Sequence, residues 1–451
     1  MNKRDSGKLG LIACIAILTG GCIGSAIFSL SGMTMIKAGA AAVITWIIAA
    51  VIYTCYGLLV TELAVRFPKS GGVFVFPARV LGNGWGFFSA WGYVISNIIA
   101  VAFSAITIGT FVCAGLSPVT QGAIWMYKDR IVLISALLAV VIVSVLNLMD
   151  VQSMGRINGI LVIMLVVAMF IYIGFAVNSP GFSLSNYSDF FSGANGKTGW
   201  ISAIPNAMVA YGACVAIAFM VGQVENPNRN VPKSLIISMI IVAVLYLLMV
   251  SSTLGIVNWR ILSDEDGAFQ PMFIAVNHMG YDAGISTFLY LVLGVAGVLS
   301  LITTMLVVQA LNGRAIQSMA DEKLIPSFLG RINRNAVPYM AVVISAAISA
   351  VLCFFSDFTT DMVNLGSVTA AVTMLIVMAT YIVVQKKKMP ENSYRAPGGV
   401  VLAVITMIVI FATYVPDIFF AEGGSTGMWI FTGIIYAIGT VTYLLCRKKS
   451  E

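Results

Sequence analysis

The stretch ILTGGCIGSAIF, residues 17–28, lies inside an apolar segment that is long enough to cross a membrane. Gly20, Gly21 and Gly24 fall near its middle, and a glycine costs roughly 1 kcal/mol relative to alanine inside a helix. Small residues four apart, such as Gly20 and Gly24, are also typical of two membrane helices in close contact. The stretch therefore predicts either a tight helix crossing or a helix that is broken at mid-membrane.

The composition indicates a membrane protein. Of the 451 residues, 59% are hydrophobic and 10% are charged, whereas about 25% are charged in an average soluble domain. With His278 as the one histidine, neither a histidine metal cluster nor a Ser-His-Asp triad is expected. The seven cysteines form no CxxC pair and lie mostly in apolar runs, as small buried hydrophobic residues do. We expect no enzyme activity, no cofactor and no metal, and we attribute the net charge of +7 to cytoplasmic loops rather than to nucleic-acid binding.

Apolar segments of about 20 residues predict an all-α polytopic membrane protein. We predict twelve transmembrane helices, at residues 9–36, 40–65, 86–113, 131–149, 157–177, 200–222, 234–257, 284–313, 337–355, 362–385, 399–416 and 428–446. Most lysines and arginines then fall in segments on one side, and an excess of positive charge marks the cytoplasmic side. The sequence thus predicts one transmembrane domain over residues 1–451, in the cell membrane, with both termini in the cytoplasm.

A second interruption is predicted in the sixth span. The segment IPNAMVAYGACVAIAFMVGQVENP, residues 204–227, has Pro205, Gly212, Ala213 and Cys214 near its middle. Spans one and six are each the first of five, and paired breaks at corresponding positions are typical of inverted-repeat transporters. We predict discontinuous helices 1 and 6, repeats at about 9–177 and 200–385, and accessory helices 11 and 12 at about 399–446.

A broken helix in the bilayer predicts a ligand. Each unpaired amide or carbonyl in hydrocarbon costs several kcal/mol, so such groups are tolerated where they line a cavity or hold a ligand. The amides that begin the second half-helix suit a carboxylate, because the positive end of the helix dipole lies there. Carbonyls at the break, such as that of Cys22, suit an ammonium group. A zwitterion fits both.

Five motifs occur in an order that resembles the amino acid–polyamine–organocation (APC) transporters. They are GGCIGSAIF at 20–28, TELAVRFPKSGGVFVF at 61–76, GQVENPNRNVPKSL at 222–235, GRAIQSMADEKLIPSFLGRINRNAVP at 313–338 and YRAPGG at 394–399. The resemblance implies a LeuT-like fold of five plus five inverted-repeat helices. It also implies transport of amino acids or amines by alternating access.

The resemblance places a substrate site at the two breaks. It implies that Gly24, Ser25 and Ala26 bind the carboxylate, and that the carbonyls of Cys22, Val209 and Gly212, with Ile23 beside them, receive the amino group. The third span would form a wall through Asn97, Val101 and Ser104, which share one helical face. Asn97 alone is equally consistent with a helix–helix hydrogen bond. Tyr211 would close the pocket from the outer side.

The sequence departs from the family pattern at both breaks. Ala26 replaces the third glycine of the first break, and its methyl group takes space where the substrate backbone would lie. Val209 and Cys214 stand where many relatives carry aromatic gates. The identity of the gating residue therefore stays open.

Few ionisable groups are available to couple transport to an ion. Glu62 and Arg66, at the inner end of the second span, form either a gate or an ordinary i,i+4 pair. Thr303 and Thr304 would supply a sodium site if their hydroxyls faced the first-helix carbonyls, although threonine commonly bonds to its own helix. No carboxylate or histidine lies at mid-depth for a proton relay. Exchange or facilitated transport is favoured over proton- or sodium-coupled symport.

The predicted site shows no acidic or aromatic partner for a cationic side chain. This favours a small or medium neutral amino acid over arginine or a polyamine, which an amine antiporter would carry. A channel would need a continuous polar pore, a membrane enzyme would need a catalytic cluster, and a receptor would move no substrate. The expected partners are an amino acid and membrane lipid, with no nucleic acid, and the oligomeric state is not predicted.

Overall fold

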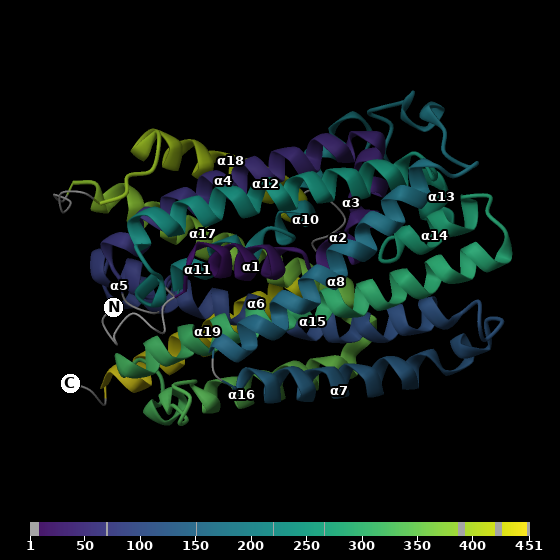
Figure 1. Cartoon of the computed structure of the whole chain (residues 1–451). Helices are drawn as coiled ribbons and strands as arrows, with labels where there is room; N and C mark the ends of the chain where they lie inside the picture. Colours follow the sequence, from purple (N-terminus) through teal and green to yellow (C-terminus); the bar gives the residue numbers. More distant parts are fainter. Residues whose placement is uncertain are drawn as a thin grey trace.

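The computed structural model describes residues 9–68, 71–149, 151–219, 221–265, 267–386, 393–419 and 426–448. Within these ranges the chain is helical, apart from turns and one isolated parallel bridge between Leu9 and Val224. Figure 1 shows the long helices lying side by side along one direction. The all-helical fold class predicted from the sequence is therefore confirmed for the described residues.

The helices follow the predicted spans, with breaks inside some of them. The first eight are α1 (Leu11–Cys22), α2 (Ser25–Ser29), α3 (Ser31–Ala38), α4 (Ala42–Arg66), α5 (Val75–Val80), α6 (Asn83–Leu116), α7 (Lys128–Asn147) and α8 (Val151–Val177). The later ones are α9 (Gly199–Ser202), α10 (Ile204–Val209), α11 (Ala216–Phe219), α12 (Pro227–Leu254), α13 (Trp259–Asp264), α14 (Pro271–His278), α15 (Ala283–Asp321), α16 (Tyr339–Leu352), α17 (Thr359–Val384), α18 (Gly399–Phe419) and α19 (Thr426–Lys448). The 3-10 helices η5 (Gly212–Val215) and η8 (Cys353–Phe358) join α10 to α11 and α16 to α17.

Nine helical stretches of the described residues are long and apolar enough to cross a membrane. The spans predicted at 337–355 and 362–385 form one stretch, Tyr339–Val384, in which Phe355 leaves the helical angles (φ −111°, ψ 43°). The span predicted at 200–222 is not among the nine, because α9, α10 and α11 are short pieces. The span predicted at 399–416 corresponds to a shorter apolar stretch, Gly399–Tyr414. The structure supports a polytopic membrane protein whose spans differ in continuity.

The outward face of α8 shows why lipid is the expected surroundings. Ile160, Ile163, Val167 and Phe170, three or four residues apart, are each more than half exposed, whereas Leu165 on the opposite face is fully buried. An apolar stripe of this kind on the outside of a helix would be unfavourable in water. These side chains are in a favourable environment when the helix faces the hydrocarbon of a bilayer.

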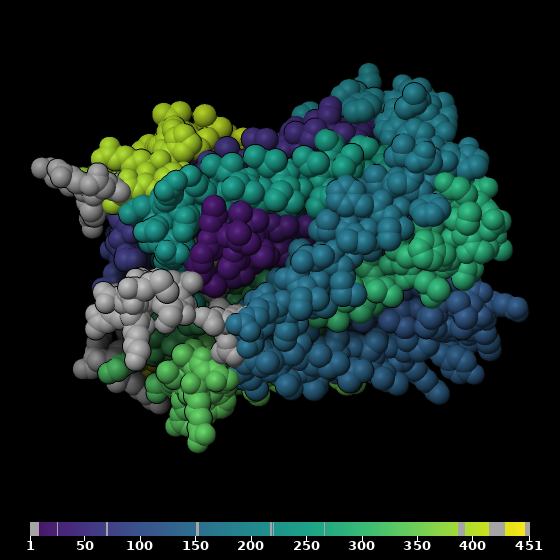
Figure 2. Space-filling view, viewed as in Figure 1, coloured from purple at the N-terminus to yellow at the C-terminus, as the bar shows by residue number. Residues whose placement is uncertain are grey.

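The first helix lies among three long helices and also contacts the short elements η5 and α11 of the sixth segment. α1 packs against α8, α12 and α15, and Figure 2 shows it on one face between α12 and α8. The amide of Leu9 donates to the Gln223 carbonyl (2.7 Å), and the Glu225 amide donates to the Leu9 carbonyl (3.0 Å). The start of the first segment is thus tied to the end of the sixth.

Candidate functional site

The first segment is interrupted after Cys22. Ile23 has φ −70° and ψ 84°, and Gly24 is extended with φ −139° and ψ −154°, before α2 begins at Ser25. Any residue can adopt these angles, so space, and not conformation, requires the glycine. A Cβ atom at Gly24 would lie 1.6 Å from Oγ1 of Thr304 on α15. Close contact with α15 therefore fixes glycine at this position.

Protein hydroxyl groups bind the carbonyls at the first break. The Tyr246 hydroxyl on α12 donates to the Cys22 carbonyl. The Thr303 hydroxyl lies 3.4 Å from the Ile23 carbonyl and 2.8 Å from the Ser300 carbonyl of its own helix. Thr303 thus combines the two alternatives left open by the sequence, because it faces a first-helix carbonyl while bonding within α15.

The sixth segment is interrupted in a different way. Ala210 keeps helical angles (φ −63°, ψ −23°), and Tyr211 departs only moderately (φ −101°, ψ 1°) before the chain tightens into η5. The Tyr246 hydroxyl also lies 3.4 Å from the Ala210 carbonyl. One side chain of α12 therefore contacts the backbone of both interruptions.

A cavity of about 140 Å³ lies beside the interruptions. Of the eleven predicted substrate-binding residues, it is lined by Asn97, Val209 and Gly212, while Gly21 and Thr304 complete the border near the first break. The other predicted residues do not border it: Cys22, Ile23, Gly24, Ala26, Val101, Ser104 and Tyr211 are buried elsewhere, and the side chain of Ser25 lies outside the described part of the chain. The cavity thus meets the backbone at Gly21 and Gly212.

The wall supplied by α6 is rotated from the predicted face. Tyr93, Asn97, Ala100 and Phe103 line the cavity at helical spacing, in place of Asn97, Val101 and Ser104. Asn97 is 8% exposed, and its side-chain Nδ2 lies near the Tyr93 hydroxyl of the same face without forming a hydrogen bond of normal geometry to it or to another described residue. A buried amide without a partner costs about 1–3 kcal/mol. Asn97 is therefore suited to donate a hydrogen bond to a molecule in the cavity.

Aromatic side chains line the cavity where none was expected. They are Tyr53 and Tyr56 of α4, Tyr93 and Phe103 of α6, and Tyr414 of α18. Tyr53, Tyr56 and Tyr414 lie outside the broken helices and the third span. Tyr93 and Phe103 lie in the third span, on a face other than the one that was predicted to form the wall. The spacing of Tyr53 and Tyr56 in the second span marks one helical face, whereas nothing in the sequence around Tyr414 points to a site.

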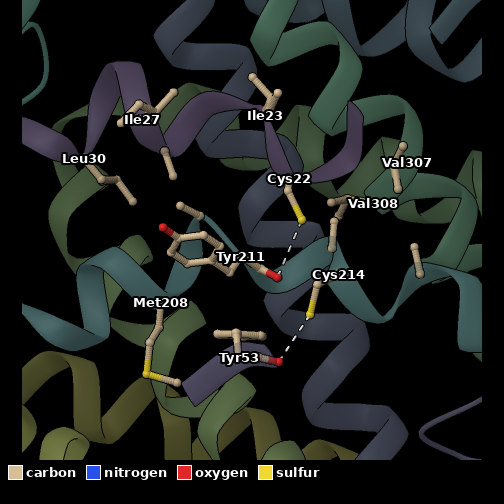
Figure 3. Close-up of a cluster of buried hydrophobic side chains, with 14 of the residues drawn as sticks. Cys22, Ile23, Ile27, Leu30, Tyr53, Met208, Tyr211, Cys214, Val307 and Val308 are labelled. Carbon is tan, nitrogen blue, oxygen red and sulfur yellow. Dashed lines mark hydrogen bonds between the residues drawn. The ribbon is translucent and has the colours of Figure 1, made fainter. Parts of the chain in front are cut away.

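Tyr211 and the two central cysteines lie in the packed core next to the cavity (Figure 3). The Tyr211 ring contacts Trp46 (6.1 Å between ring centroids) and Tyr246 (5.3 Å), and its hydroxyl donates to the Trp46 carbonyl (3.2 Å). The Cys22 sulfur lies 3.8 Å from the Tyr211 carbonyl, and the Cys214 sulfur lies 3.8 Å from the Tyr53 carbonyl. These contacts tie the first break to the sixth segment and the sixth segment to α4.

Glu62 lies in a separate polar cluster at the end of α4. Its carboxylate is 2% exposed and accepts hydrogen bonds from the Tyr381 hydroxyl (2.6 Å), the Gln385 amide (2.6 Å) and the backbone amide of Ala396 (2.8 Å). Burial, and then the nearby Glu62 charge, raise the pKa of Tyr394 to about 12. Two of the sequence motifs, at 61–76 and 394–399, therefore meet through one carboxylate.

Comparison with known proteins gives the family. The sequence model of the amino acid permeases matches residues 9–443. The chain belongs to the amino acid permease family. This permease is thus an amino acid transporter of the APC superfamily and a multi-pass membrane protein, as the motifs predicted.

Curated relatives cover nearly the whole permease. It is 25% identical to the branched-chain amino acid permease BcaP of Bacillus subtilis (strain 168), over 88% of this chain and 84% of that protein. It is 24% identical to BcaP of Lactococcus lactis subsp. cremoris (strain MG1363), over 97% and 94% of the two chains. The histidine permease HisP of the same organism is 23% identical, over 93% and 90%. These relatives are named as permeases and not as enzymes.

Proposed function

We propose that this permease moves a neutral amino acid across the cytoplasmic membrane by alternating access. The observation that carries the proposal is a cavity that meets two interrupted helices and has a buried amide donor on Asn97 that makes no hydrogen bond of normal geometry among the described residues. Interrupted helices in a membrane protein are typical of substrate sites. The proposal includes twelve spans, a LeuT-like five-plus-five inverted repeat with helices 11 and 12 outside it, and cytoplasmic termini.

The substrate backbone is proposed to bind between the two breaks. Its carboxylate would accept hydrogen bonds from the amides that begin α2, at Gly24, Ser25 and Ala26. Its ammonium group would donate to carbonyls of the interruptions, at Cys22, Val209 and Gly212. In the present structure Gly24 and Cys22 lie just outside the cavity lining, so substrate binding would need a small opening of the first break.

The substrate side chain is proposed to be neutral and mainly apolar. Among the described residues that line the cavity none is charged, and most lining atoms are apolar. Burying an unpaired ammonium or guanidinium group in such a site would be strongly unfavourable. The branched-chain permeases among the relatives support an aliphatic substrate side chain. The histidine permease among them indicates that a relative can also carry an amino acid with a polar ring.

Exchange or facilitated transport is the proposed mode, because none of the described lining residues is a carboxylate or histidine that could carry a proton. Sodium coupling is the alternative, and it would use Thr303 and Thr304 opposite the first-helix carbonyls. Amine or polyamine antiport is a further alternative, and the aromatic lining would serve it through cation–π contacts.

The Glu62 cluster is proposed to hold the inner end closed. Glu62 joins α4 to α17 and to the loop before α18, so inward opening that separates these elements would break its bonds. Arg66, one turn further along α4, belongs to the same proposed gate, and Tyr211 would act at the outer side. Glu62→Gln, which removes the charge, should raise the rate of substrate release to the inside; an unchanged rate would argue against this role.

Transport by purified protein in liposomes tests the function. Liposomes loaded with unlabelled amino acids should take up labelled leucine, isoleucine or valine by counterflow, and neither a sodium nor a pH gradient should be required. Uptake that strictly needs sodium would favour the alternative of sodium-coupled transport, with an ion site at Thr303 and Thr304. Strong preference for arginine or a polyamine would contradict the neutral class, and the absence of any exchange would favour a receptor.

A further inference from the structure

Tyr414 connects the cavity to a helix outside the proposed repeats. It lies in α18, is 3% exposed, and borders the same cavity as Asn97 and Gly212. α18 packs against α4, α10 and α17. A helix that follows both repeats therefore contributes an aromatic ring to the space beside the breaks.

The sixth break and this ring border one cavity, together with Tyr53. A Cβ atom at Gly212 would lie 3.8 Å from the Tyr53 hydroxyl. Tyr53 and Tyr414 border the same cavity. A substrate side chain that starts at the backbone of the break and extends past Tyr53 would lie in the space that Tyr414 borders.

The sixth segment leaves room in this direction. Val209 lines the cavity and is 38% exposed, although most apolar residues of the core are fully buried. Tyr53 of α4 and Tyr414 of α18 line the same cavity, so its lining includes residues of α10, α4 and α18. Tyr414 and Tyr53 then form the walls of the part of the cavity that the Val209 side chain leaves empty.

We propose that the ring of Tyr414 is the far wall of the side-chain subsite and limits the length of the substrate side chain. The proposal rests on the proposed function and narrows its substrate class to aliphatic amino acids of up to about the size of leucine. Tyr414 is thus a specificity-determining residue, and α18 is part of the substrate site. A limit set by packing is expected to be graded, because one methylene group in an apolar pocket changes selectivity by about 10-fold or more.

Competition against leucine counterflow tests the proposal. In Tyr414→Ala, phenylalanine and tryptophan should inhibit leucine uptake at least about 10-fold better relative to valine than they do in the natural protein. Tyr414→Phe keeps the ring and should keep the natural ranking. Tyr443→Ala is the matched control, because Tyr443 of α19 packs on Phe87 (5.2 Å between centroids) and is not among the cavity residues.

The outcomes separate this inference from the function beneath it. If the natural protein exchanges aliphatic amino acids but Tyr414→Ala keeps the ranking, Tyr414 is not the far wall. If Tyr414→Ala cannot be purified, Tyr414→Trp must shift the ranking toward alanine and valine, and an unchanged ranking overturns the proposal. If the natural protein exchanges no amino acid, the proposed function itself is wrong. Thermal shifts of the purified variants with the same amino acids give a second reading that does not depend on transport.

Discussion

The two interrupted segments differ in how far the backbone leaves the helix and in what covers it. At Ile23 and Gly24 the chain is fully unwound, and Gly24 is pressed against Thr304. At Ala210 and Tyr211 the chain only tightens, and Gly212 faces open space with Tyr53 as its nearest neighbour. The first break is sealed against α15, whereas the second borders the cavity.

The difference suggests a division of roles between the breaks. The Cys22 and Ile23 carbonyls already lie near the hydroxyls of Tyr246 and Thr303, so the first break is held in place by protein groups. The second break presents backbone to the cavity at Gly212. A substrate would therefore reach the second break first and would have to compete with protein hydroxyls at the first.

Alanine at the two glycines should have very different effects, and this is the largest effect we expect. Gly24→Ala forces a methyl group into the Thr304 hydroxyl, and overpacking of this kind costs about 1–3 kcal/mol or more. We expect at least about a 10-fold loss of transport, since a displaced site loses correct positioning. Gly212→Ala places its methyl group 3.8 Å from the Tyr53 hydroxyl, so it should fold normally and change mainly the apparent affinity. Initial rates of uptake and thermal unfolding in detergent measure both.

Equal behaviour of the two variants would remove the distinction. If Gly24→Ala unfolds at the natural temperature and transports normally, Thr304 can move and the first break is not sealed. Gly24→Ala combined with Thr304→Ala should recover part of the stability, because the second change removes the atom in closest conflict. A double variant no better than Gly24→Ala would show that another contact sets the requirement.

Tyr246→Phe should have the next largest effect, because it removes the hydroxyl that contacts both breaks. It leaves the buried Cys22 carbonyl without this donor, at a cost of about 1–3 kcal/mol. Tyr172→Phe is the matched control: its hydroxyl pairs with Thr253 on α12, and Thr253 keeps its bond to the Met249 carbonyl. The temperature of unfolding should fall more for Tyr246→Phe, and transport should fall with it. Equal shifts would mean that the contact of the Tyr246 hydroxyl with both breaks adds no more stability than one ordinary buried hydroxyl.

The sequence predicted the breaks well because helix-disfavouring residues mark them locally. Gly20, Gly21 and Gly24 in the first segment, and Pro205 with Gly212 in the sixth, indicate interruptions whatever the surrounding helices do. The sequence did not show that the two breaks differ, because Thr304 lies 280 positions after Gly24. Which helix presses on a glycine is decided by tertiary packing.

The walls of the cavity were predicted less well for the same reason. Asn97, Val101 and Ser104 were grouped because their spacing places them on one helical face. The face of α6 that lines the cavity instead carries Tyr93, Asn97, Ala100 and Phe103. Glu62 stood out as a charge in a span, yet its partner Tyr381 is 319 positions away. Tyr414 carried no signal, since a tyrosine near the end of an accessory helix is ordinary in membrane proteins.

The smallest effect we expect concerns the cysteine in each break. Cys22 and Cys214 are 2% and 1% exposed, and each sulfur contacts only a backbone carbonyl at 3.8 Å among the hydrogen-bond partners that the structure describes. A buried cysteine acts as a small hydrophobic residue, so Cys22→Ser and Cys214→Ser should change transport by less than about 3-fold, within the range of a modest buried polar change.

Labelling with a maleimide measures how exposed the two cysteines become. The reagent should react with Cys22 and Cys214 more slowly than with Cys446, which is partly exposed near the end of α19. Suppose instead that Cys22 reacts as fast as Cys446 and that substrate slows the reaction. The first break then opens to water during transport, and substrate binds at both breaks rather than at the second alone. If only Cys214 reacts fast, the first break stays sealed and the second opens, so the segment that moves during transport is α10 and η5.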